Sequence, residues 1–113
     1  MLPFLPEHLL PRFAKAKAYT LAILKEGENY STEDRDKIIQ SEHLPHLFKL
    51  EDEGIICFSM PVAEEGSYAG ISIYTETDKE IVKAYIEADP AVQKKLFTYE
   101  IFSSMGFQVS ILK

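Results

Sequence analysis

The sequence predicts an α+β domain in which strands and helices follow the order β-α-β-β-α-β, a split βαβ arrangement. Short runs rich in β-branched and aromatic residues alternate along the chain with two amphipathic runs of helical period. Gly or Pro stands near the ends of these runs. The 113-residue chain is 46% hydrophobic and 27% charged, which is typical of one globular domain. We therefore expect an antiparallel sheet with both helices packed on one face.

The first strand and the first long helix are expected early in this domain. Residues 18–25 are rich in strand formers. Ser31 or Thr32 can then cap a helix that runs toward Asp52, with acidic residues in its first turn that suit the helix dipole. Gly54 suits the position after the helix end, because glycine accepts the left-handed conformation found there.

Pro45 interrupts this helix. It has no N–H to donate to the carbonyl of Ser41, so we expect a kink beside His43. The kink can be a local bend or the junction of two abutting helices, and the sequence leaves both open.

The remaining elements follow toward the C-terminus. They are a strand at 55–62, a turn at 64–67, a strand at 68–75, a helix from Asp78 that ends at Asp89-Pro90, a short turn from Pro90, and strands at 97–102 and 107–112. Residues 6–16 can form a short helix broken or bent at Pro11. We interpret residues 1–17 as an N-terminal extension and residues 18–113 as one domain.

Composition and charge exclude several classes of protein. The net charge of −6 and the scattered basic residues argue against nucleic-acid binding. The single Cys57 cannot form an internal disulfide, which favours a reducing compartment. The N-terminus makes a poor signal peptide, and no apolar run approaches the ~20 residues of a membrane span. We expect a cytoplasmic protein with neither nucleic acid nor membrane as a partner.

His43 and Asp89 are the candidate catalytic pair. At 100° per residue, Ile39, His43 and Leu47 fall on one side of the first helix, so the imidazole faces the core. Asp89 stands at the end of the second helix, and the two side chains can meet if these helices lie together. A carboxylate can fix the tautomer of an imidazole, which exchanges protons near neutral pH.

Each residue of this pair also has a structural interpretation. His43 can be a hydrogen-bonded, semi-buried histidine without a chemical role. Asp89 directly before Pro90 is a common helix start, in which its side chain accepts from the amide of Val92 or Gln93. Both roles of the aspartate can coexist, because a carboxylate has several acceptor sites.

The order and spacing of these motifs resemble the YciI-like (YCII-related) family. The motifs are His43-Leu44…Leu47…Leu50…Gly54, a strand that ends near Pro61, a hairpin, a second helix and Asp89-Pro90. Over roughly residues 18–103, the resemblance implies a ferredoxin-like domain that forms dimers of the α/β-barrel type or larger assemblies. It also implies that His43 and Asp89 correspond to the family's paired histidine and aspartate, which face a cleft and are proposed to be catalytic. The family's best-understood reaction removes chloride from a chlorinated hydroquinone.

Two features depart from the family pattern. Residues 58–61, Phe-Ser-Met-Pro, stand where many relatives carry a small Ala-Gly-Pro turn, and we expect them to crowd the pocket mouth. The aromatic residue near the family's C-terminal end has two candidates here, Phe102 and Phe107.

Further polar side chains are candidates for substrate binding. Arg35 can bind a substrate anion, and Tyr19 and Ser59 can supply pocket hydroxyls, although a solvated arginine and a packing tyrosine are the plainer interpretations. His46 can join them, and with His43 and an aspartate it could approach a metal, but the intervening proline disturbs the spacing and we expect no metal. Without a Gly-rich phosphate loop, we expect no nucleotide cofactor.

Two functions follow from these residues. The first is a small cofactor-independent enzyme in which the His43–Asp89 pair performs acid–base chemistry of a lyase, dehydrochlorinase or isomerase type on a small aromatic or carbonyl-bearing substrate. The alternative is a non-catalytic ligand-binding or assembly module on the same fold. In both, the second face of the sheet needs a cover, and back-to-back pairing into a homodimer or larger homo-oligomer supplies it.

Overall fold

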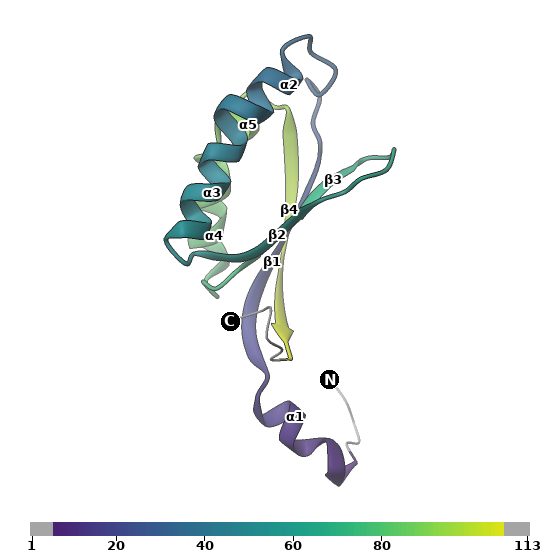
Figure 1. Ribbon diagram of the computed structural model, residues 1–113, viewed down its shortest axis with the longest axis vertical. Coiled ribbons are helices and arrows are strands. Elements are labelled where there is room, and N and C mark those ends of the chain that lie inside the picture. Colours follow the sequence, from purple (N-terminus) through teal and green to yellow (C-terminus); the bar gives the residue numbers. More distant parts are fainter. Residues whose placement is uncertain (1–5, 108–113) are drawn as a thin grey trace.

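The computed structural model describes residues 6–107, and in them the predicted element order is confirmed (Figure 1). Four strands form one antiparallel sheet in the order β2-β3-β1-β4. The strands are β1 (Lys17–Glu26), β2 (Ile56–Pro61), β3 (Tyr68–Tyr74) and β4 (Phe97–Gly106). Because β1 and β3 are central and the helical segments connect β1 to β2 and β3 to β4, this is the ferredoxin-like split βαβ topology.

The helices lie on one face of this sheet, as predicted. Figure 1 shows α2 to α5 together on one side of the strands, whereas α1 lies beyond the first residues of β1, away from the other helices. The helical segments are η1 (Glu7–Leu9), α1 (Leu10–Ala14), α2 (Arg35–Ile38), the π-helical turn η2 (Ile39–His43), α3 (Leu44–Asp52), α4 (Lys79–Glu87) and α5 (Pro90–Gln93).

The core forms between the sheet and these helices because side chains alternate along each strand. On β1, Ala22 and Leu24 are buried, whereas Leu21 and Ile23, which alternate with them, are only half-buried. The buried set meets Val82 of α4 and the other core residues of the helices. The sheet therefore has one face in the core, and this is the face to which the helices bring their polar side chains.

Pro45 produces a kink of a particular kind. The chain runs from α2 through the π-turn η2 into α3 without a break, and Pro45 stands in the first turn of α3. A proline cannot bond to the carbonyl four residues back, and a π-turn, whose bonds run five residues back, accommodates that loss. Ser31 and Thr32 do not cap this segment, contrary to the prediction; α2 follows Asp34 and has no side-chain cap.

Gly54 ends α3 as predicted. Its φ of +77° lies in the left-handed region, which glycine adopts without strain. Its N–H donates to the carbonyl of Glu51, and the N–H of Ile55 donates to that of Leu50. This is a Schellman motif, and it turns the chain directly into β2.

At the N-terminal end of the described chain, the 3-10 turn η1 passes into α1, and Pro11 lies in the first turn of α1, close to the predicted break. The C-terminal end differs from expectation. β4 is one strand that continues to Gly106, paired with Lys17 of β1, and so extends past the predicted end at residue 102. Phe107 lies outside the strand, and the remainder of the strand predicted at 107–112 lies outside the described residues.

The face of the sheet opposite the helices is apolar at its centre. Leu21 on β1 pairs with Ile73 on β3 and with Phe102 on β4, and no described helix covers this side in Figure 1. Phe102 is 44% exposed. Nowhere between residues 6 and 107 does a helix have the length and apolar character needed to cross a membrane.

Candidate active site

His43 and Asp89 meet in the structure, although 46 positions separate them. His43 is the last residue of η2, and Asp89 precedes α5, which packs against that turn. Nδ1 of the imidazole lies 2.5 Å from Oδ2 of the carboxylate. The residues are only 6% and 3% exposed, so solvent screens this charge-assisted hydrogen bond little.

Both oxygens of Asp89 are engaged. Oδ2 accepts from the His43 ring, and Oδ1 accepts from the N–H of Ala91 at 2.9 Å, which caps α5. The cap partner is therefore Ala91 and not Val92 or Gln93 as predicted, because the N–H groups of those two residues donate to the backbone carbonyl of Asp89. The capping interaction fixes the carboxylate and the carboxylate fixes the imidazole.

The His43 ring also packs against an aromatic wall and reaches a cavity. Its centroid lies 4.9 Å from that of Phe97, with the planes inclined at 58°. Nε2 makes no hydrogen bond to any residue from 6 to 107, yet no buried side-chain nitrogen or oxygen in this range lacks a partner. Nε2 therefore keeps accessible surface, and His43 is one of the residues that line a cavity.

This cavity measures about 520 Å³, within the range of small-molecule sites. Its walls come from η2 and α3 on one side and from β2 and β3 on the other, and most of them are apolar. The lining residues are Leu24, Tyr30, Ile39, His43, Leu44, Leu47, Phe48, Glu51, Ser59, Met60, Pro61, Val62, Ala69, Gly70, Ile71, Ser72 and Phe97. Phe48 and Met60 are about half exposed and form the rim.

Three polar residues besides His43 lie in the cavity wall. Ser59 donates its hydroxyl hydrogen to Oε2 of Glu51 at 2.8 Å. Ser59 of β2 pairs directly with Ser72 of β3, so both serines stand on the same side of the sheet. Ser59 was predicted from the sequence as a candidate for substrate binding, whereas the contact that brings Glu51 to it is evident only in the structure.

The other candidates for substrate binding lie elsewhere. The guanidinium of Arg35 stacks over the Tyr30 ring, 4.7 Å from its centroid, and pairs with Asp36. His46 is bonded through Nε2 to the carbonyl of Tyr85 at 2.8 Å. Arg35, His46 and Tyr19 are absent from the cavity lining; Tyr19 is 4% exposed, with the Lys17 ammonium over its ring. Between residues 6 and 107 no cluster of three metal-ligating side chains occurs.

The segment expected to crowd the pocket mouth does border it. Met60 and Pro61 line the cavity, and Met60 is 47% exposed at its rim. They form part of the opening but do not fill the cavity behind it. Phe102 belongs to the opposite face of the sheet, and Phe107 packs edge-on against Phe13 with centroids 4.9 Å apart.

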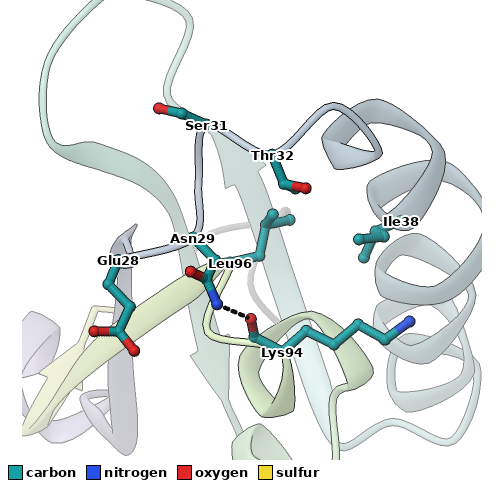
Figure 2. Close-up of a pocket in the computed structure, with 7 residues that line it drawn as sticks. All are labelled: Glu28, Asn29, Ser31, Thr32, Ile38, Lys94 and Leu96. Carbon is teal, nitrogen blue, oxygen red and sulfur yellow. Dashed lines mark hydrogen bonds between the residues drawn. The ribbon is translucent and has the colours of Figure 1, made fainter.

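A second hollow opens near the N-terminal end of α2, and the ammonium group of its lysine is engaged. It measures about 450 Å³. Figure 2 shows Asn29 donating from Nδ2 to the carbonyl of Lys94, at 3.0 Å. The Lys94 ammonium is itself bonded to both carboxylate oxygens of Glu42, at 2.8 and 2.9 Å. This hollow therefore offers no free cation.

Two ionisable groups outside the cavity lining have raised pKa values. Burial, and secondarily the charge of Asp89, raise the pKa of Tyr74 far above its usual value. Burial raises the pKa of the Cys57 thiol as well. A neutral thiol is a weak nucleophile, so nothing in this direction of shift activates Cys57.

The comparisons with known proteins bear on the fold alone. The chain matches no protein-family model and no curated protein. Its structure is similar to that of 5-chloro-2-hydroxyhydroquinone dehydrochlorinase (TftG) from Burkholderia phenoliruptrix AC1100, solved in complex with 2,5-dihydroxybenzoquinone. The TM-score is 0.54 and the identity 17%, and the match covers 80% of this chain and 93% of that one.

Proposed function

We propose that this protein is a small cofactor-independent enzyme in which His43, held by Asp89, moves a proton on a small ring-shaped or carbonyl-bearing substrate. The observation that carries the proposal is that the two ring nitrogens of His43 have different surroundings. Nδ1 is bonded to Asp89, whereas Nε2 is accessible beside an apolar cavity of about 520 Å³. A histidine oriented by a carboxylate at such a site is a common general acid–base arrangement.

The chemistry follows from the tautomer that Asp89 selects. With the proton on Nδ1 donated to the carboxylate, Nε2 carries a lone pair and can take a proton from a C–H or O–H group of the substrate. The ring then becomes an imidazolium, and the adjacent carboxylate stabilises its charge. The electron pair left on the substrate either expels a leaving group from the neighbouring atom, which is an elimination, or is reprotonated at another atom by the same ring, which is an isomerisation.

The structural neighbour supports this class of reaction, since TftG is a dehydrochlorinase that binds a quinone. We also propose that the chain is a divergent member of the YciI-like family, on the strength of the shared topology and the His43–Asp89 pair. A dehydrochlorinase-like elimination on a ring-shaped substrate is the first reaction to test.

Proton transfer can be tested before the natural substrate is known. Small phenols, quinols and cyclic ketones, with and without a halogen, would be incubated with the protein in D2O and followed by NMR for deuterium incorporation and halide release. We expect at least one compound to exchange or eliminate with the wild-type chain. His43→Gln should abolish that activity, because Gln retains a donor for Asp89 but not a base.

His46→Gln is the matched control. His46 stands on the same helix, three residues later, and its ring is bonded to a backbone carbonyl outside the cavity. This variant should keep full activity. If His43→Gln retained activity while folded, His43 would not be the base.

The alternative function is a ligand-binding module without catalysis. It is favoured by the depth of the His43–Asp89 pair and by the capping role of Asp89, which together give the pair a structural reason to exist. Binding of ring compounds to the cavity, with neither exchange nor elimination for any of them, would support this alternative.

We further propose that two copies pair through the open face of the sheet. Leu21, Ile73 and Phe102 form its apolar centre, and an antiparallel sheet with one bare apolar face is normally covered. Ile73→Lys should convert a dimer to monomers in sedimentation velocity, whereas a wild-type chain that sediments as a monomer would refute the pairing.

A further inference from the structure

We propose that Glu51, Ser59 and Ser72 form a hydroxyl-binding site in the cavity that selects uncharged ligands carrying an alcohol or phenol group and rejects anions. This inference rests on the proposed function only in taking the cavity as the substrate site. It adds the class of ligand and the residues that choose it.

Glu51 and His43 stand about two turns apart on the same helical segment. Glu51 lies eight residues after His43, about 12 Å further along the helical segment at 1.5 Å per residue. Both line the cavity, together with Leu47 halfway between them. A ligand in this space therefore meets a proton-transfer group at one end, an apolar middle and a second polar group at the other end.

The hydroxyl of Ser72 has no hydrogen-bond partner among the described side chains and backbone groups. Ser72 is only 5% exposed and lines the cavity, and it makes no side-chain hydrogen bond to any residue between 6 and 107. Since no buried polar side-chain atom in that range lacks a partner, the Ser72 hydroxyl must be accessible from the cavity. A polar group kept so deep without a protein partner indicates that a ligand or water partners it.

The free hydrogen-bonding groups of Glu51 and Ser72 are complementary to a hydroxyl group. Glu51 uses Oε2 to accept from Ser59, and no bond to a described residue engages its Oε1. Oε1 can only accept, whereas the hydroxyl of Ser72 can donate. A ligand hydroxyl satisfies both, because it donates to Glu51 and accepts from Ser72. A ligand carboxylate can only accept, and it would face the charge of Glu51.

The cavity lining holds no lysine or arginine side chain that could compensate for the charge of Glu51. Of the residues that line the cavity, only Tyr30, His43 and Glu51 are ionisable. Arg35, which could have attracted an anion, is absent from the lining; it stacks on Tyr30 and pairs with Asp36. While His43 is neutral, an anionic ligand therefore meets no cation in this lining to offset the repulsion by Glu51.

The test compares two ligands that differ mainly in charge, 4-methylphenol and 4-methylbenzoate. Their dissociation constants would be measured at pH 7 by NMR titration of the full chain, following the amides of the cavity residues. We expect the wild-type chain to bind 4-methylphenol at least about tenfold more tightly. Glu51→Gln should improve binding of 4-methylbenzoate about tenfold, because it removes the charge and keeps an acceptor for Ser59. Ser72→Ala should weaken 4-methylphenol several-fold.

Glu53→Gln is the matched control, since it removes the same charge from the exposed C-terminal end of the same helix, outside the cavity. It should leave the ratio of the two constants unchanged. The proposal is overturned if Glu51→Gln leaves that ratio unchanged, if the wild-type chain prefers 4-methylbenzoate, or if neither ligand shifts the cavity resonances. Loss of this preference with intact proton transfer would refute only the hydroxyl-binding site. The preference without proton transfer would refute only the proposed enzyme.

Discussion

Replacing Asp89 with asparagine separates its two roles. Asn caps a helix about as well as Asp, so the bond from the N–H of Ala91 should survive through the remaining oxygen. The amide nitrogen must then face His43, and it donates where the carboxylate accepted. The ring is forced to accept at Nδ1 and to carry its proton on Nε2, so Nε2 can no longer act as a base.

The cost in stability follows from the hydrogen bond that changes. A buried hydrogen bond to a charged group contributes about 1.5–3 kcal/mol, and the neutral bond that replaces it returns about 0.5–1.5 kcal/mol. Asp89→Asn should therefore lower the free energy of unfolding by about 1–2 kcal/mol. For a chain of 113 residues, this corresponds to a fall in Tm of about 4–8 °C. Any activity found should fall by about 10³–10⁴, as expected for the wrong tautomer.

The assay is thermal unfolding by circular dichroism, with Asp78→Asn as the control. Asp78 caps α4 by accepting from the N–H of Glu80 at 2.9 Å and has no bond to a histidine. Asp78→Asn should change Tm by less than about 2 °C, in line with the similar capping strength of the two residues. If Asp89→Asn were no more destabilising than Asp78→Asn, the bond to His43 would contribute little and the reasoning would be wrong.

Three further predictions concern other parts of the fold. Gly27→Ala should lower the free energy of unfolding by about 1–3 kcal/mol, measured by urea denaturation, because a Cβ at this position would lie 2.3 Å from the carbonyl oxygen of Lys95. The pKa of Tyr99 is raised to about 12, chiefly by burial and then by its hydrogen bond to Glu87. The contribution of Tyr99 to the free energy of unfolding is therefore complete below the unfolded pKa of 10.0 and is lost as the pH rises through 12. Tyr99→Phe should therefore flatten the fall of Tm across that interval; an unchanged slope would count against it. Cys57, whose pKa burial raises, should react with iodoacetamide at pH 7.5 more slowly in the folded chain than in urea, and equal rates would contradict this.

The sequence predicted the fold and the contact between His43 and Asp89 because both depend on short-range signals. Strand alternation and the glycine at position 54 fixed the element order, and helical periodicity placed His43 on the core side. The split βαβ topology then brings the ends of two helices together, which is why residues 46 positions apart could be paired in advance.

The hydroxyl-binding site could not be predicted because it depends on an irregularity in a strand. Strict alternation would place Ser59 on the face opposite Ile56, but the register of β2 shifts between Ile56 and Phe58. Such a shift turns the following residues to the other face, so Ser59 comes to lie beside Glu51. No sequence pattern marks this bulge. The stacking of Arg35 on Tyr30 is likewise a contact through space that no sequence pattern indicates.

The central claim is that Asp89 keeps the proton of the neutral His43 ring on Nδ1 and leaves Nε2 free to accept another. Nitrogen-15 NMR of the histidine-labelled chain reports this directly, with the His43 signals assigned by their loss in His43→Gln. Our account requires the Nδ1–H tautomer and a change in the Nε2 resonance when 4-methylphenol is added. A neutral ring protonated on Nε2, or an Nε2 resonance unaffected by any ring-shaped ligand that binds the cavity, would contradict it.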